Sequence, residues 1–83
     1  MTRRQVAEFD SEILLMDGFD DCIAGVATRC GGEQFAVYDY ELVISKLQSD
    51  GMTYEEAVEY HDFNQLGACS KERMPAFIRT KQP

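Results

Sequence analysis

Three cysteines and one histidine are the side chains of this chain that come nearest to a metal-ligand set. Cys22, Cys30, His61 and Cys69 supply the sulfur and imidazole donors that suit a tetrahedral zinc ion. Seven residues separate Cys22 from Cys30, and seven separate His61 from Cys69, whereas structural zinc sites usually take one pair from a knuckle of about two to four residues. The spacing therefore favours buried free thiols, with His61 on the inner face of a helix, over a zinc site. No metal and no cofactor is expected.

Three aspartates lie close together at Asp17, Asp20 and Asp21, around Gly18 and Phe19. Grouped carboxylates can bind a divalent cation or work as an acid and base pair. Their spacing matches no regular ligand loop. A turn whose carboxylates accept hydrogen bonds from nearby backbone amides explains the same residues, and we favour that interpretation.

The sequence contains none of the common catalytic or phosphate-binding motifs. Glycine-rich phosphate loops, the HExxH metal helix, the GxSxG elbow, paired CxxC units and the calcium-loop pattern are all absent. A chain of 83 residues also leaves little depth for a substrate cavity. We therefore do not expect an enzyme.

The charge distribution indicates the class of partner. The formal net charge is −7, and fourteen acidic but only two basic side chains lie between Gln5 and Leu66, while both ends of the chain are basic. Such a surface repels phosphate backbones, so direct nucleic-acid binding is not expected. The acids are either a solvated face that keeps the protein soluble, or a mimic of nucleic-acid charge that binds basic protein surfaces.

The richest group of candidate binding residues falls in one segment near the middle of the chain. Acidic and aromatic side chains occur together there, at Glu55, Glu56, Glu59, Tyr60, Asp62 and Phe63. On a helix the four acids cover the outer face, and tyrosines beside acids are common at protein interfaces. Phe63 would lie in the middle of the acids if the helix continued. We expect the helix to end near Asp62 and Phe63 to turn inward, the alternative being an exposed ring for a partner.

Two helices are predicted around a joint at residues 50–53. Asp39 can cap a helix over residues 40–49, which has an apolar stripe and ends before Gly51. Thr53 and Glu56 form a capping box for a second helix over about residues 54–64. Tyr54, Ala57, Val58 and His61 would form its inner face.

Strands are predicted over residues 12–16, 22–30, 35–38 and 75–79. Residues 22–30 also fit a helical spacing, but Gly25, Thr28 and the Gly31–Gly32 pair favour a strand and a hairpin loop. Pro75 and the cations that follow residues 76–78 are typical of an edge strand. The sequence thus predicts a single α+β domain over residues 1–83, frayed at 1–10 and 80–83. In it an antiparallel sheet of three to four strands packs on two helices in two layers.

Neither the cysteines nor the N-terminal residues indicate export. Three cysteines without regular spacing favour a reducing compartment. The apolar run at residues 13–16 is too short for a signal-peptide core or a membrane span. A cytoplasmic protein is expected.

The segments described above resemble a family of short, uncharacterised proteins encoded by phages and prophages, across most of Leu14 to Ile78. The matching pieces are Leu15–Asp21, Arg29–Gly31, Ala36–Asp39, Asp50–Ala57, Phe63–Asn64, Gly67–Ala68 and Pro75–Ile78. The chain departs from the family at residues 69–72, where Cys69, Ser70, Lys71 and Glu72 replace an aromatic residue and a Gly-Glu pair. No role of that loop is therefore carried over. The resemblance implies a viral origin, a bacterial cytoplasm and no catalytic residues.

These observations predict a binding protein. The first hypothesis is a small acidic phage-type protein that occupies a basic surface of a host protein and inhibits or modulates it. The alternative is a structural or assembly protein that forms a homo-oligomer through Phe63 or the strand edge near Phe77. A small enzyme or metal-binding protein ranks last.

Overall fold

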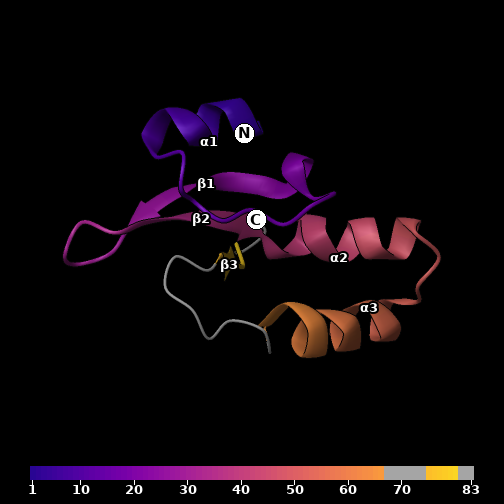
Figure 1. Cartoon of the computed structure of the whole chain (residues 1–83). Helices are drawn as coiled ribbons and strands as arrows, with labels where there is room; N and C mark the ends of the chain where they lie inside the picture. The colour runs from indigo at the N-terminus through magenta and orange to yellow at the C-terminus, as the bar shows by residue number, and fades with distance from the viewer. Residues whose placement is uncertain (67–74, 81–83) are drawn as a thin grey trace.

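The computed structural model describes residues 1–66 and 75–80 of the chain. Its helices are α1 (Arg3–Phe9), α2 (Tyr40–Ser49) and α3 (Tyr54–Tyr60), and its strands are β1 (Ile23–Thr28), β2 (Gln34–Asp39) and β3 (Ala76–Ile78). A 3₁₀ turn at Asp20–Cys22 leads into β1, and a π-helical segment, His61–Leu66, continues α3. Figure 1 shows α1 beside β1 on one side of the molecule and α3 on the opposite side. The predicted α+β class is confirmed.

Strands β1 and β2 form an antiparallel hairpin, in which Val26 pairs with Ala36 and Ala27 with Phe35. The loop between them contains Gly31 and Gly32, both with positive φ, a conformation that side chains with a Cβ rarely adopt. The strand interpretation of residues 22–30 is confirmed over the helical one, with a register irregularity between Ile23 and Gly25.

Strand β3 pairs with β2 in parallel, so the prediction of a wholly antiparallel sheet is wrong. Tyr38 pairs with Phe77, and the strand order is β1-β2-β3, which places β3 at an edge as predicted. The direction follows from the connection, because two helices lie between β2 and β3 and carry the chain back to run the same way. Parallel strands require such a crossover, whereas antiparallel neighbours can be joined by a tight hairpin.

The strand predicted at residues 12–16 is absent. This stretch is irregular: Ile13 is buried, but Leu14 is 43% exposed. The Met16 amide donates to the Tyr38 hydroxyl at 2.8 Å, so a side chain of β2 provides its acceptor. An apolar run therefore covers the core here without joining the sheet.

The N-terminal residues are helical, which corrects the prediction that residues 1–10 fray. Thr2 and Gln5 form a capping box: the Gln5 amide donates to Thr2 Oγ1 at 3.2 Å, and the Thr2 amide donates to Gln5 Oε1 at 2.9 Å. Val6 is buried and attaches α1 to the core. The tail at 81–83 lies outside the described residues.

Helix α2 spans the predicted residues, and its caps are the predicted ones. The Leu42 amide donates to the Asp39 carboxylate at 3.1 Å. At the other end, the Gly51 amide donates to the Gln48 carbonyl and the Met52 amide to the Leu47 carbonyl, a Schellman closure with Gly51 at φ 107°. The core is formed by side chains from both helical and sheet elements, among them Val6, Ala36, Tyr38, Tyr40, Val43, Ile44, Leu47 and Ala57.

Candidate functional site: the outer face of helix α3

All six predicted partner-binding residues are exposed on one continuous helical surface. Glu55, Glu56, Glu59 and Tyr60 lie on α3, and Asp62 and Phe63 follow on the π-helical segment. We call these six residues the α3 face. It begins where predicted, because the Glu56 amide donates to Thr53 Oγ1 at 3.2 Å and the Thr53 amide donates to Glu56 Oε1 at 2.9 Å.

The expected inward turn of Phe63 is wrong. The Phe63 side chain is 80% exposed. The cause is local: the chain does not leave the helix near Asp62 but continues in π-helical form as far as Leu66. The ring therefore keeps its helical position among the acids, which is the alternative that the sequence left open.

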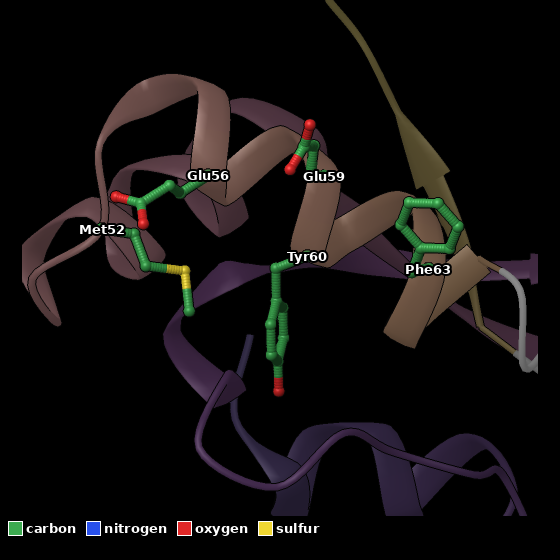
Figure 2. A pocket seen from close by; sticks show the side chains of 5 residues that line it. All are labelled: Met52, Glu56, Glu59, Tyr60 and Phe63. Atoms are coloured by element: carbon green, nitrogen blue, oxygen red, sulfur yellow. The ribbon is translucent and has the colours of Figure 1, made fainter.

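A shallow groove crosses the α3 face. It has a volume of about 350 Å³ and is lined by Met52, Glu56, Glu59, Tyr60 and Phe63. Figure 2 shows Tyr60 in the middle, with Met52 on one side and Phe63 on the other. The last four residues recur at i, i+3, i+4 and i+7, the spacing of one helical face. Met52 was missed at the sequence level, although it lies four residues before Glu56 and so continues the same stripe.

A second depression of about 300 Å³ lies along the same helix, lined by Tyr54, Glu55, Val58 and Glu59. Glu59 belongs to both depressions. Tyr54 was predicted on the inner face with Ala57, Val58 and His61. Ala57 and His61 are buried as expected, but Tyr54 is 55% exposed. It therefore adds a third exposed aromatic ring to this side of the molecule.

The inner side of the helix is fixed by a cluster of rings. His61 is 1% exposed, and its ring meets Phe77 of β3 edge to face with centroids 4.4 Å apart. It meets the ring of Tyr40, at the start of α2, at 5.1 Å. Phe77 also packs against Tyr38 at 5.9 Å. The α3 face is thus carried on a helix whose back is packed against both α2 and the sheet.

The acids of the α3 face differ in what they contact. Hydrogen bonds to Thr53, first of all to its backbone amide, hold the pKa of Glu56 below its usual range. Within residues 1–66 and 75–80, Glu55, Glu59 and Asp62 form no ion pair. The charges of these three carboxylates therefore face solvent. Glu56 differs from them because it helps to cap its own helix.

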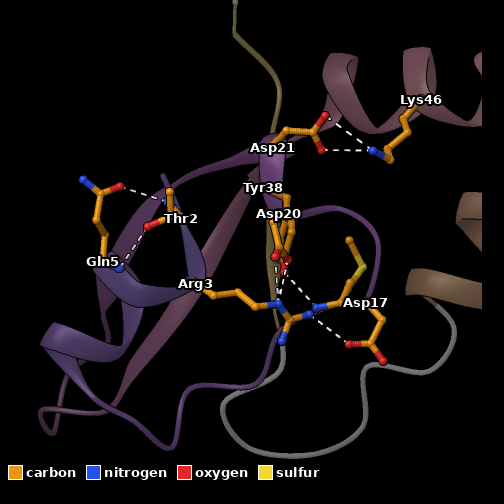
Figure 3. A network of polar contacts seen from close by, with 9 residues as sticks. Thr2, Arg3, Gln5, Asp17, Asp20, Asp21, Tyr38 and Lys46 are labelled. Atoms are coloured by element: carbon orange, nitrogen blue, oxygen red, sulfur yellow. Dashed lines mark hydrogen bonds and ion pairs between the residues drawn. The ribbon is translucent and has the colours of Figure 1, made fainter.

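The other acidic group is neutralised by the chain itself (Figure 3). Arg3 Nη2 lies 2.8 Å from Asp17, and Arg3 Nε lies 2.8 Å from Asp20. Lys46 Nζ lies 3.1 Å from Asp21, and this hydrogen bond lowers the pKa of Asp21 and raises that of Lys46.

The predicted turn at these aspartates is present, with Gly18 at φ 85°. The three carboxylates, however, accept hydrogen bonds mainly from cations of α1 and α2 rather than from backbone amides. This group is a set of ion pairs that ties α1 and α2 to the segment between α1 and β1.

The candidate zinc ligands are not brought together. Cys22 directly precedes β1, and Cys30 lies beyond its end, so a six-residue strand rising about 3.3 Å per residue separates them. Cys22 is buried but Cys30 is exposed, contrary to the expectation of buried thiols, and Cys69 lies outside the described residues. No group of three potential metal-ligating side chains occurs within the described part of the chain.

Among the described residues, no helix has the length and apolar character needed to cross a membrane. No protein-family model, curated protein or solved structure matches this chain.

Proposed function

We propose that this protein is a small phage-type binding protein of the bacterial cytoplasm, which docks its α3 face on a basic surface of a host or phage protein. Binding alone, with no catalytic step, inhibits or modulates that protein. The phage setting rests on the sequence resemblance. The binding role rests on one observation above all, the exposed Phe63 ring among acids that form no ion pair with the described residues.

The two kinds of side chain have complementary roles in such a contact. Aromatic rings supply most of the binding energy at protein interfaces when they become fully desolvated. Carboxylates at the rim attract a basic partner over about 10 Å at 0.1 M salt and select against acidic ones. If the basic surface normally holds DNA or RNA, its occupancy is enough to inhibit by competition.

The alternative function is a homo-oligomer. One structural observation supports it and another argues against it. The 80% exposed Phe63 ring could pack against a second copy. Two α3 faces brought together would, however, place Glu55, Glu59 and Asp62 of each copy against like charges, which is unfavourable at low salt. Added salt should therefore weaken binding to a basic partner but strengthen self-association.

A pair of matched variants tests the proposal by affinity purification from host lysate. Glu55→Gln/Glu59→Gln removes one negative charge from the first turn of α3 and one from its middle. Glu8→Gln/Glu41→Gln removes the same number of charges, one from α1 and one from the first turn of α2. At about 0.05 M salt the wild type and the Glu8/Glu41 variant should retain the same partner, and the Glu55/Glu59 variant should lose it.

Raising the salt to about 0.5 M should release the partner from the wild type. Equal retention by both variants would refute the role of the α3 face. In light scattering, a dimer of the wild type that strengthens with salt would favour the homo-oligomer.

A further inference from the structure

We propose that the groove lined by Met52, Tyr60 and Phe63 holds an arginine side chain of the partner, whose guanidinium stacks on the Phe63 ring and pairs with Glu59. This inference rests on the proposed function and specifies it further, because it names the chemical group that the basic partner must present.

The lining of the groove combines two aromatic rings, one thioether and two carboxylates. At about 350 Å³ the groove is at the small end of the range of roughly 300–1,000 Å³ for ligand pockets, and it is open along the helix. Such a site accepts one long side chain lying along its floor better than it encloses a separate molecule. Met52 and Tyr60 offer the apolar surface that the methylene groups of a long basic side chain cover.

The charges select a cation. No basic side chain lines the groove. Glu56 already accepts the Thr53 amide at 2.9 Å, whereas Glu59 makes no ion pair with any described residue. Glu59 is therefore the carboxylate with the greater capacity to bind an incoming cation.

The rings select a planar cation. A guanidinium stacks flat on an aromatic face while its edge donates to a carboxylate, a combination that the compact lysine ammonium cannot provide. Within the described residues, a guanidinium already lies over an aromatic ring at two places: the guanidinium carbon of Arg79 is 4.0 Å from the Tyr40 ring centroid, and that of Arg29 is 5.0 Å from the Phe35 ring centroid. Among the described residues no arginine lies over Tyr60 or Phe63 in this way.

Three peptides of equal length, alternating glycine with arginine, lysine or citrulline, provide the test. The ring signals of Tyr54, Tyr60 and Phe63 are followed by NMR during titration of the full chain at about 0.05 M salt. The arginine peptide should shift the Phe63 and Tyr60 signals and bind about threefold or more tightly than the lysine peptide. The citrulline peptide, which keeps the shape but lacks the charge, should not bind.

Two variants assign the effect to the groove. Phe63→Leu keeps an apolar side chain but removes the ring, so it should lower arginine-peptide affinity to that of the lysine peptide. Tyr54→Leu removes another exposed ring, the 55% exposed Tyr54 of the neighbouring depression, and should leave the affinity unchanged. Unchanged affinity in Phe63→Leu, or shifts confined to Tyr54, would overturn the groove assignment and leave the proposed function standing.

Failure of both basic peptides to bind would instead count against the proposed function as well. Two other occupants give their own signatures. Phe63 shifts that depend on protein concentration without peptide would assign the groove to a second copy. Arg73 lies outside the described residues, and a shift of the Phe63 signals in the variant Arg73→Gln without peptide would assign the groove to this arginine of the same chain. Either result would overturn the inference.

Discussion

The rings of His61 and Phe77 lie edge to face, with centroids 4.4 Å apart and an interplanar angle of 87°. This contact joins the segment that continues α3 to the edge strand β3. The ring of Tyr40 also packs against this imidazole, with centroids 5.1 Å apart. One buried histidine thus ties the helix that carries the α3 face to both α2 and the sheet.

Replacing that histidine should destabilise the whole domain. We expect His61→Ala to lower the free energy of unfolding by on the order of 2–4 kcal/mol, because it leaves a cavity between two rings. Tyr60→Ala, one residue earlier and 40% exposed, should cost less than about 1 kcal/mol. Urea unfolding followed by circular dichroism measures both. Similar losses in the two variants would show that the ring cluster does not anchor α3.

The end of α2 depends on the left-handed conformation of Gly51, which has φ 107°. Gly51→Ala should lower the free energy of unfolding by about 1–2 kcal/mol, since a Cβ is disfavoured there. Gly25→Ala is the matched control, because an added Cβ at Gly25 meets nothing within 4 Å and its φ is not positive. That variant should be close to neutral. A neutral Gly51→Ala would contradict the closure described here.

Stability should fall in acid through the carboxylate of Asp21. The hydrogen bond from Lys46 lowers the pKa of Asp21 in the folded protein. A carboxylate with a depressed folded pKa contributes stability above its ordinary pKa of about 3.9, and this contribution is lost as the pH falls through the folded pKa. The urea midpoint of the wild type should therefore drop below about pH 4.

Asp21→Asn and Lys46→Met should each make that drop shallower without abolishing it, because Glu56 also has a lowered pKa. The measurement is the urea midpoint from neutral pH to below about pH 3. Curves parallel to that of the wild type would show that the pair contributes nothing.

The sequence predicts the elements whose signals are local. The ends of the helices are predicted by Asp39, Gly51 and the Thr53–Glu56 capping box. Each cap needs only side chains within a few residues of the backbone groups that it satisfies. The exposure of the four acids of the α3 face was predicted for the same reason. The spacing of its acids along one helix decides their exposure before any tertiary contact is considered.

What escaped prediction depends on contacts distant in sequence. The parallel direction of β3 follows from the route of the chain through two helices, and residues 76–78 carry no sign of it. Residues 13–16 are apolar because Ile13 belongs to the core and Leu15 and Met16 pack against it. This packing role gives the same run of residues as a strand. Helix α1 buries only Val6, so no apolar stripe marks it, although the Thr2–Gln5 capping box was a visible signal. The exposure of the Phe63 ring depends on the π-helical continuation of α3, which the hydrophobic periodicity of the sequence does not indicate.

The cap of α3 should couple stability to binding. Thr53→Ala removes the hydroxyl that accepts the Glu56 amide at 3.2 Å, which should cost about 1 kcal/mol of stability. It also frays the turn that carries Glu55 and Glu56, so affinity for the arginine peptide should fall together with helicity. Thr53→Ser keeps the acceptor oxygen and should preserve both. Urea unfolding and peptide titration on the same three proteins check this. If Thr53→Ala loses stability but binds the peptide as tightly as Thr53→Ser, the first turn of α3 is not part of the binding surface, and recognition is confined to Glu59, Tyr60 and Phe63.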